Sequence, residues 1–192
     1  VSAIEELHFT IPSYLTISDL NIPDSEQQLA DKELGYYIYA LNSPMQSGQT
    51  VDVAFTIDWL TPGFVNNSPT SSLLNNGTFF NNTEIMPMPG YQQGNEILDN
   101  NRRRRYDLPP AERMAKIDDE SMYTNPGLGT GVRVGYESIV STSTDQIAVT
   151  PGYLVREWEE GGRRYFHYRM DQPIWPFVSY LSADYEVKAD KW

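Results

Sequence analysis

The chain has 192 residues, and its 26 acidic and 14 basic residues give a net charge of −12. The resulting negative electrostatic field repels phosphate backbones and disfavours nucleic-acid binding. The absence of cysteine excludes disulfides and thiolate metal sites. Thirteen tyrosines, thirteen prolines and thirteen glycines favour short strands joined by turns, and the length suits one domain with a real core.

The first part of the chain predicts strands. Residues 4–10 suit an opening strand, and Pro12 and Pro23 limit any helix in the segment that follows to a turn or two. Residues 36–41 (YYIYAL) form an aromatic, β-branched run typical of a strand. In residues 51–59, apolar side chains recur at every second position, which predicts a half-buried strand.

Residues 61–83 are rich in turn residues and contain three N-x-S/T sequons, at Asn66, Asn76 and Asn81. We interpret these sequons as chance matches in an asparagine-rich loop. Thr78, Phe79 and Phe80 predict a short buried strand within this segment, and the prolines of residues 86–91 keep that stretch extended.

Residues 95–122 are the best helical candidate, with Asn95 as the cap and Pro109-Pro110 as an interruption. A second helical turn is expected over residues 111–117. The arginine run at 102–105 resembles a phosphate clamp, but in an acidic domain we interpret it as a solvated face or an internal ion-pair partner.

The stretch 153–170 predicts a hairpin at the centre of the fold. Gly161-Gly162 lies between two strand-forming runs, and both positions of such a two-residue turn require positive φ. The register that results pairs several opposite charges and aromatic rings at once. The predicted pairs are Glu160–Arg163, Glu159–Arg164, Trp158–Tyr165, Arg156–His167 and Val155–Tyr168.

Further strands are expected at 132–140, 145–150 and 176–187. The predicted fold is therefore all-β, a saddle-like sandwich of mostly antiparallel strands with one or two short helical turns around 95–120. We expect residues 1–192 to form a single β-domain. The chain begins at Val1 and stops within a strand-like segment, so we also expect it to be excised from a larger protein.

Residues with catalytic potential are sparse. His8 and His167 lack the paired spacing of a zinc motif, and we interpret both as structural. The acidic run 118–120 is interpreted as a solvated turn, so the chain is predicted not to be an enzyme. A second class of function rests on an aromatic platform for a glycan or a protein, although core packing is the favoured interpretation of each ring. The platform candidates are Tyr36, Tyr37, Tyr39, Phe79, Phe80, Trp158, Tyr165, Tyr168 and Trp175.

Several segments resemble the N-terminal β-domain of aminopeptidase N-like zinc metallopeptidases. Pro44, Gly48, Val51, Val53 and Phe55 match a loop and strand of that family; Gly77, Phe79 and Phe80 match its Gly-aromatic motif; and residues 176–187 resemble its closing strand. The chain is more similar still, over residues 34–192, to the peptidase-like region of bacterial membrane proteins fused to an ABC-type transporter permease. The matching segments are residues 76–82, 90–92, 102–110, 141–154 and 157–168.

This resemblance implies a non-catalytic domain of a membrane-tethered, extracytoplasmic protein. Its expected partners are a downstream zinc-peptidase domain, whose substrate cleft it lines, and the transmembrane permease region. A peptide is the implied substrate. Zinc and its motif are expected only downstream, with no cofactor here. The resemblance also assigns Glu84 to binding the substrate α-amine. The alternative is an autonomous extracytoplasmic glycan- or protein-binding β-sandwich.

Overall fold

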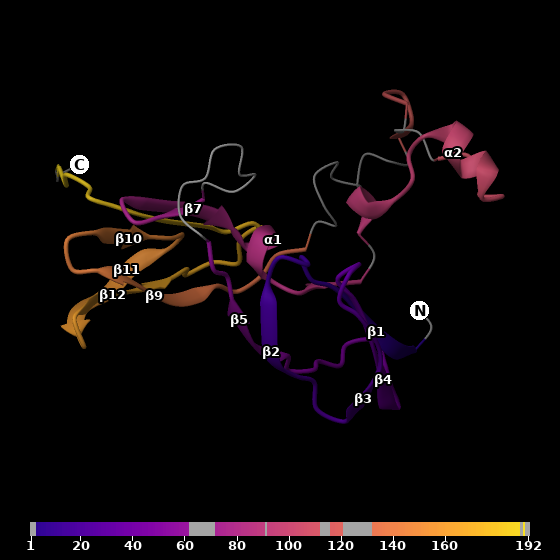
Figure 1. Ribbon diagram of the computed structural model, residues 1–192, viewed down its shortest axis with the longest axis horizontal. Coiled ribbons are helices and arrows are strands. Elements are labelled where there is room, and N and C mark those ends of the chain that lie inside the picture. The colour runs from indigo at the N-terminus through magenta and orange to yellow at the C-terminus, as the bar shows by residue number, and fades with distance from the viewer. Residues whose placement is uncertain are drawn as a thin grey trace.

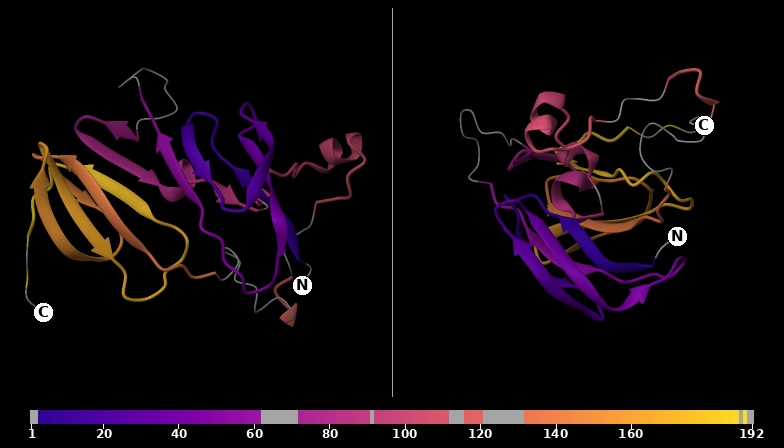
Figure 2. Two further views of the ribbon diagram at one scale, coloured as in Figure 1. Left: turned by 90° about the horizontal axis from the view of Figure 1, so that it is seen from below. Right: turned by 90° about the vertical axis from the view of Figure 1, so that its right-hand side faces the viewer.

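The computed structural model describes residues 3–61, 72–90, 92–111, 116–120, 132–188 and 190. The protein is all-β, with antiparallel sheets and only short helices, as the sequence predicts. Figure 1 shows two groups of sheets side by side, with helix α1 (Asn82–Ile85) between them and helix α2 (Asn100–Arg105) projecting beside the N-terminal group. The left view in Figure 2 shows the two groups side by side from below.

The N-terminal group contains two sheets. One has the strand order β3-β4-β1-β8, and the other pairs β2 with β5. The strands are β1 (Ile4–Thr10), β2 (Thr16–Asn21), β3 (Ser25–Asp31), β4 (Tyr36–Met45), β5 (Ala54–Asp58) and β8 (Met88–Pro89). Phe9, Tyr37 and Tyr39 of these strands meet Ile11, Leu15 and Ile22 of the connecting segments in one buried cluster.

The C-terminal group also contains two sheets, in the orders β10-β13-β7-β6 and β11-β12-β9. The strands are β6 (Leu73–Leu74), β7 (Gly77–Asn81), β9 (Glu137–Ser143), β10 (Ile147–Val149), β11 (Tyr153–Glu160), β12 (Arg163–Arg169) and β13 (Ser179–Ala183). Its buried cluster is Ala148, Phe166 and Tyr168, and Phe166 is only 1% exposed.

A row of four aromatic rings joins the two groups. Tyr14 and Trp59 come from the N-terminal group and Phe80 and Tyr180 from the C-terminal group, with successive ring centroids 5.4, 5.8 and 5.2 Å apart. Burial, and a hydrogen bond with Tyr136, raise the pKa of Tyr180 above its ordinary value. The row therefore packs the two groups of sheets against each other, and Tyr14 at its end is half exposed.

The central hairpin is confirmed. Gly161 and Gly162 have φ of 56° and 74°, and Trp158 pairs with Tyr165 across the ladder, their rings stacked at 5.1 Å. Positive φ at both turn positions is the geometry that matches the right-handed twist of the strands.

The predicted register fails at the far end of the hairpin. Leu154, not Val155, pairs with Tyr168, because a β-bulge lies between Leu154 and Arg156. Gly152 lies so close to the Arg169 backbone that a Cβ would come within 2.9 Å of the Arg169 carbonyl carbon. This contact fixes the end opposite the turn, so the extra residue is accommodated at Val155.

Side-chain pairing in the hairpin also differs from the prediction. Glu159 does lie opposite Arg164 in the ladder, but the Arg164 guanidinium forms its ion pair with Glu157, at 2.6 Å. Glu157 is the diagonal neighbour on the same face, within reach of a long arginine side chain.

One strand was not predicted, and two local predictions were wrong. The segment after Pro23, where the prolines limit any helix to a turn or two, forms strand β3 through its pairing with β4. Phe79 is 54% exposed rather than buried, since it points away from the face that carries Phe80. Helix α2 is capped by Asp99, whose side chain accepts from the Arg102 N–H, and not by Asn95.

Two further predictions, the sequon at Asn66 and most of the helical turn over residues 111–117, lie outside the described residues.

Candidate functional site: a groove along strand β1

An open groove of about 1270 Å³ runs along β1. Strands β1 and β8 form one part of it, together with Pro12, Leu34 and Tyr36. Thr83 of α1 and the segment around the 3-10 turn η1 (Gln93–Asn95) form another part. Its surface is mainly apolar, with Ile4, Leu7 and Met88 among the lining residues. We call this feature the β1 groove.

The alternation of β1 determines which side chains reach the groove. Phe9 is buried in the N-terminal core, and Leu7 packs against that core while also bordering the groove. Glu6 and His8 point to the opposite face of the strand and line the groove. Tyr36 reaches the same face from β4, because it pairs with Thr10, the next residue of that face.

Glu6, His8 and Tyr36 form a connected polar strip. The His8 Nδ1 lies 2.6 Å from the Tyr36 hydroxyl oxygen, and the His8 Nε2 lies 3.3 Å from Glu6 Oε2. The Glu6 side chain is 44% exposed and the His8 side chain 36%, so both remain accessible to a ligand. Such a strip supplies hydrogen-bond donors and acceptors beside an apolar surface, as binding sites for small molecules and peptides do.

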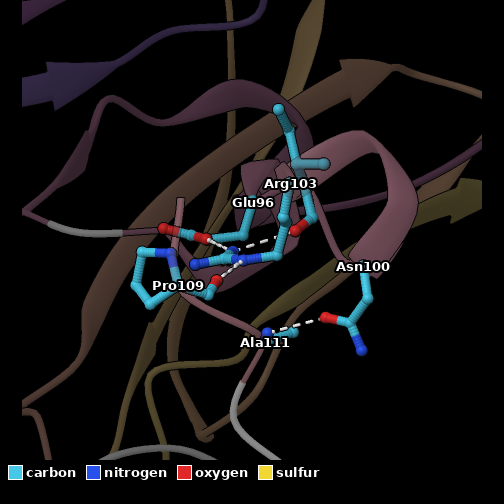
Figure 3. Close-up of polar contacts among 6 residues, drawn as sticks. Glu96, Asn100, Arg103, Pro109 and Ala111 are labelled. Carbon is cyan, nitrogen blue, oxygen red and sulfur yellow. Dashed lines mark hydrogen bonds and ion pairs between the residues drawn. The ribbon is translucent and has the colours of Figure 1, made fainter. Parts of the chain in front are cut away.

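The wall of the groove at Glu96 is held by Arg103. Figure 3 shows the Arg103 side chain directed at the Glu96 carboxylate (2.6 Å) and the Pro109 carbonyl oxygen (2.5 Å). Arg103 also donates to the Ile97 carbonyl oxygen, at 2.9 Å. With its side chain only 11% exposed, Arg103 fits the prediction of an internal ion-pair partner. Arg103 thus stabilises the segment that borders the groove.

Besides the Tyr36 phenol, the ionisable side chains that line the groove are Glu6, His8 and Glu96, and neither lysine nor arginine is among its described lining residues. Because Arg103 compensates Glu96, Glu6 is the accessible carboxylate. The groove therefore favours an uncharged or cationic occupant over an anion.

The structure places Glu84 beside the groove rather than in it. Its neighbour Thr83 lines the groove, but Glu84 Oε2 accepts a hydrogen bond from the Asn81 backbone N–H at 2.7 Å. The Glu84 carbonyl also accepts from the Tyr14 hydroxyl at 2.9 Å. The carboxylate stabilises the first turn of α1, and its amine-binding role stays a prediction. Glu84→Gln is the matched variant for testing it, because the amide still accepts from Asn81.

The hairpin residues lie in the C-terminal group, apart from the groove. The Trp158 ring is in contact with Tyr165 and with the Arg156 guanidinium, 4.8 Å from its centroid. Of the other platform candidates, Tyr37, Tyr39 and Tyr168 are buried in the two cores. These rings pack against protein.

The histidines and acidic residues are dispersed. His167 pairs with Glu137 at 2.6 Å on β12 and β9, in the C-terminal group, whereas His8 lies in the N-terminal group. Within the described part of the chain, no group of three histidine, aspartate or glutamate side chains is arranged to hold a metal ion. No helix among the described residues is long and apolar enough to span a bilayer.

Sequence reasoning missed Glu6 and Tyr36 as members of a site. The spacing of Glu6 and His8, two apart on a predicted strand, places both on one face and is visible in the sequence. The contribution of Tyr36 depends on the pairing of β1 with β4, which no local pattern specifies. Comparisons with protein-family models, curated proteins and solved structures found no match to this chain.

Proposed function

We propose that this chain is a non-catalytic β-module that lines the peptide cleft of a larger, membrane-linked, extracytoplasmic protein, beside a zinc-peptidase domain. The observation that carries the proposal is the β1 groove, an open and mainly apolar channel with one polar strip. The neighbouring domain, the permease region and the cell-surface setting follow from the sequence resemblance.

The shape and chemistry of the groove support a peptide as the occupant. An extended peptide presents apolar side chains and backbone hydrogen-bonding groups at regular intervals, and the groove offers both kinds of contact along one strand. Ile4 and Met88 provide apolar surface, and Glu6, His8 and Tyr36 provide polar contacts.

Two matched glycine variants test binding at the groove. Gly94 lines the groove and Gly135 does not; neither has positive φ, and a Cβ at either would have no atom within 4 Å. Gly94→Trp is expected to fill the groove and weaken binding of short extended peptides at least tenfold, since a bulky ring excludes the occupant from its contacts. Gly135→Trp should leave the affinity unchanged. Isothermal titration with both variants measures this, and equal affinities for the two would refute the groove as the binding site.

The non-catalytic assignment has its own test. Catalytic zinc needs three protein ligands and an open position, and in our proposal these belong to the downstream domain. Incubated with equimolar zinc and an aminoacyl nitroanilide, the chain is expected to release no nitroaniline. Zinc that remains bound at one per chain after gel filtration, with hydrolysis, would overturn this part of the proposal.

A further inference from the structure

Strand β1 has two edges, and only one is paired along its length. On one side it pairs with β4 from Ile4 to Thr10. On the other side β8 pairs only with Phe9 and Thr10. The ladder on that side ends where the Gly90 N–H donates to the His8 carbonyl oxygen, at 2.9 Å.

The backbone that follows β8 turns away from β1 at Gly90. Gly90 has a φ of 77°, a left-handed conformation that turns the backbone away from the line of the strand. The rest of the β1 edge, over Ile4–Leu7, has no strand partner on this side among the described residues.

The direction of the backbone groups follows from the bonds that are present. The Ile11 N–H donates to the Gly35 carbonyl, on the β4 side, whereas the His8 carbonyl accepts on the β8 side. In an antiparallel ladder, residues alternate between the two sides. The pairing of β1 with β4 is regular from Glu6 to Thr10, so the N–H and C=O of Glu6 face the same side as those of His8.

The β1 groove borders that side. Ile4, Glu6, Leu7 and His8 line the groove together with Met88 and Gly90, so the unpaired part of β1 adjoins open space. An unpaired edge is a template for an added strand. Added strands of this kind gain affinity from main-chain hydrogen bonds and specificity from alternate side chains.

We propose that the β1 groove binds an extended peptide as an additional antiparallel or parallel strand against Ile4–Leu7, continuing the line of β8. The negative charge of the groove favours a peptide that places a lysine or arginine side chain near Glu6. The accessible carboxylate there and the absence of lysine and arginine from the described lining residues favour a cation. This inference rests on the proposed peptide binding and specifies its mode and its substrate class.

The first experiment varies the peptide. The probe is acetyl-Thr-Val-Lys-Val-Thr-amide, compared by titration with its glutamate-centred analogue and with analogues N-methylated at one residue each. Strand addition predicts alternation: methylation at every second residue weakens binding about tenfold, because it removes a hydrogen bond directed at β1. Methylation at the intervening residues should change the affinity by less than about twofold. The glutamate analogue should bind about fivefold more weakly, as expected for one partly exposed charge pair.

The second experiment varies the protein. Glu6→Gln removes the charge and keeps the backbone N–H, whereas Glu6→Pro removes both while leaving the β4 ladder bonds of Leu7 and Phe9 in place. The lysine peptide should lose affinity in both variants, and more in Glu6→Pro. The uncharged analogue with a central threonine should distinguish the two variants. Its affinity should be unchanged for Glu6→Gln and weaker for Glu6→Pro. Hydrogen exchange in the unmodified chain should show protection of the Glu6 amide on saturation with peptide, a readout that needs no variant to fold.

The outcomes separate the two proposals. Peptide binding that is blocked by Gly94→Trp but shows no alternation on N-methylation and no protection of Glu6 overturns strand addition and leaves the proposed function standing. Equal affinity for the lysine and glutamate peptides overturns the charge selection. Binding of no peptide at millimolar concentration overturns both proposals.

Discussion

At the residue scale, buried hydroxyl and amide groups connect segments that are distant in sequence. Asn82 is buried at the start of α1: its Nδ2 donates to the Pro176 carbonyl at 3.2 Å, and its Oδ1 accepts from the Val178 N–H at 2.9 Å. The Tyr136 hydroxyl lies 2.6 Å from Thr150 Oγ1, and Tyr136 also hydrogen-bonds to Tyr180. Among the described residues, every buried side-chain nitrogen or oxygen atom has a hydrogen-bond partner.

The raised pKa of Tyr180, one of the two tyrosines of the aromatic row, predicts a loss of stability in alkali. Burial is the main cause that raises the pKa of Tyr180 above the ordinary value of 10.0, so the folded state holds the phenol proton more tightly than the unfolded state does. The stabilisation is complete below pH 10 and is lost as the pH rises from 10 toward the folded-state pKa. Urea unfolding should show the free energy of unfolding falling with pH in that range.

Tyr180→Phe keeps the ring and removes the titrating group. Above pH 10 it should reduce the slope of stability against pH by up to about 1.4 kcal/mol per pH unit, one proton's worth. Tyr153→Phe is the control, because Tyr153 is 68% exposed. Identical slopes for the two variants would contradict the assignment to Tyr180.

Residue-scale features were only partly predictable from the sequence. The positive φ of Gly161 and Gly162 follows from the dipeptide itself, and the period-2 pattern places Val51, Val53 and Ile57 against the N-terminal core. The partners of Asn82 were not predictable, because 94 to 96 positions separate them from it in sequence and no local rule relates them.

At the scale of elements, the junction of β3 and β4 depends on one close backbone contact. Gly35 has a φ of 66°, and its carbonyl accepts from the Ile11 N–H at 2.8 Å. A Cβ at this position would lie 1.9 Å from the Ile11 carbonyl oxygen. The chain after β1 therefore packs directly on the backbone of the turn that begins β4.

A comparison of Gly35→Ala with Gly48→Ala separates the effect of this close contact from the cost of a left-handed backbone. Both glycines have positive φ, but a Cβ at Gly48 would meet no atom within 4 Å. Gly48→Ala should lower the free energy of unfolding by about 1 kcal/mol, for the left-handed backbone alone. Gly35→Ala should cost about 3 kcal/mol or more, because the backbone must also shift. Urea denaturation measures both, and a cost for Gly35→Ala no greater than that for Gly48→Ala would show that the contact is not stabilising.

Elements were predicted best where local pattern and turn chemistry agree. Strand β1 has its predicted bounds, and β11 and β12 form the predicted hairpin. Strand β3 and the bulge at Val155 were missed because both depend on what the chain packs against. The β1 groove was missed for the same reason, since β1 and β8 come from opposite ends of the first ninety residues.

At the scale of the whole molecule, an aromatic row links the two groups of sheets. Residues 1–192 were predicted to form a single domain, and the row supplies a physical basis for cooperation between the groups. Trp59, which packs against the N-terminal core, contacts Phe80 of the C-terminal group edge to face at 5.8 Å. We predict that removal of this contact uncouples the two groups of sheets.

Adjacent phenylalanines on β7 test the coupling. Phe80 touches both Trp59 and Tyr180, whereas Phe79 is more than half exposed. Phe80→Ala should cost about 2–3 kcal/mol, somewhat less than a fully buried phenylalanine, and Phe79→Ala less than about 1 kcal/mol.

Hydrogen exchange at Tyr37 and Phe166 reports on the two clusters separately. In the unmodified chain and in Phe79→Ala, both amides should exchange with the same free energy of opening. In Phe80→Ala the two values should diverge. Equal values in Phe80→Ala would show that the clusters are coupled by some other contact.

The position of β13 between β10 and β7 has a consequence for folding kinetics. Its Ser179 hydroxyl donates to Asn81 Oδ1 across 98 positions of sequence, and every other strand of that sheet precedes it in the chain. Contacts between residues this far apart in sequence form only after a long loop has closed. The entropic cost of closing that loop slows folding. During synthesis β7 and β10 emerge from the ribosome well before the strand that separates them. The C-terminal sheet is therefore assembled late, and until then β7 and β10 expose unpaired edges on which chaperones or other nascent chains can act.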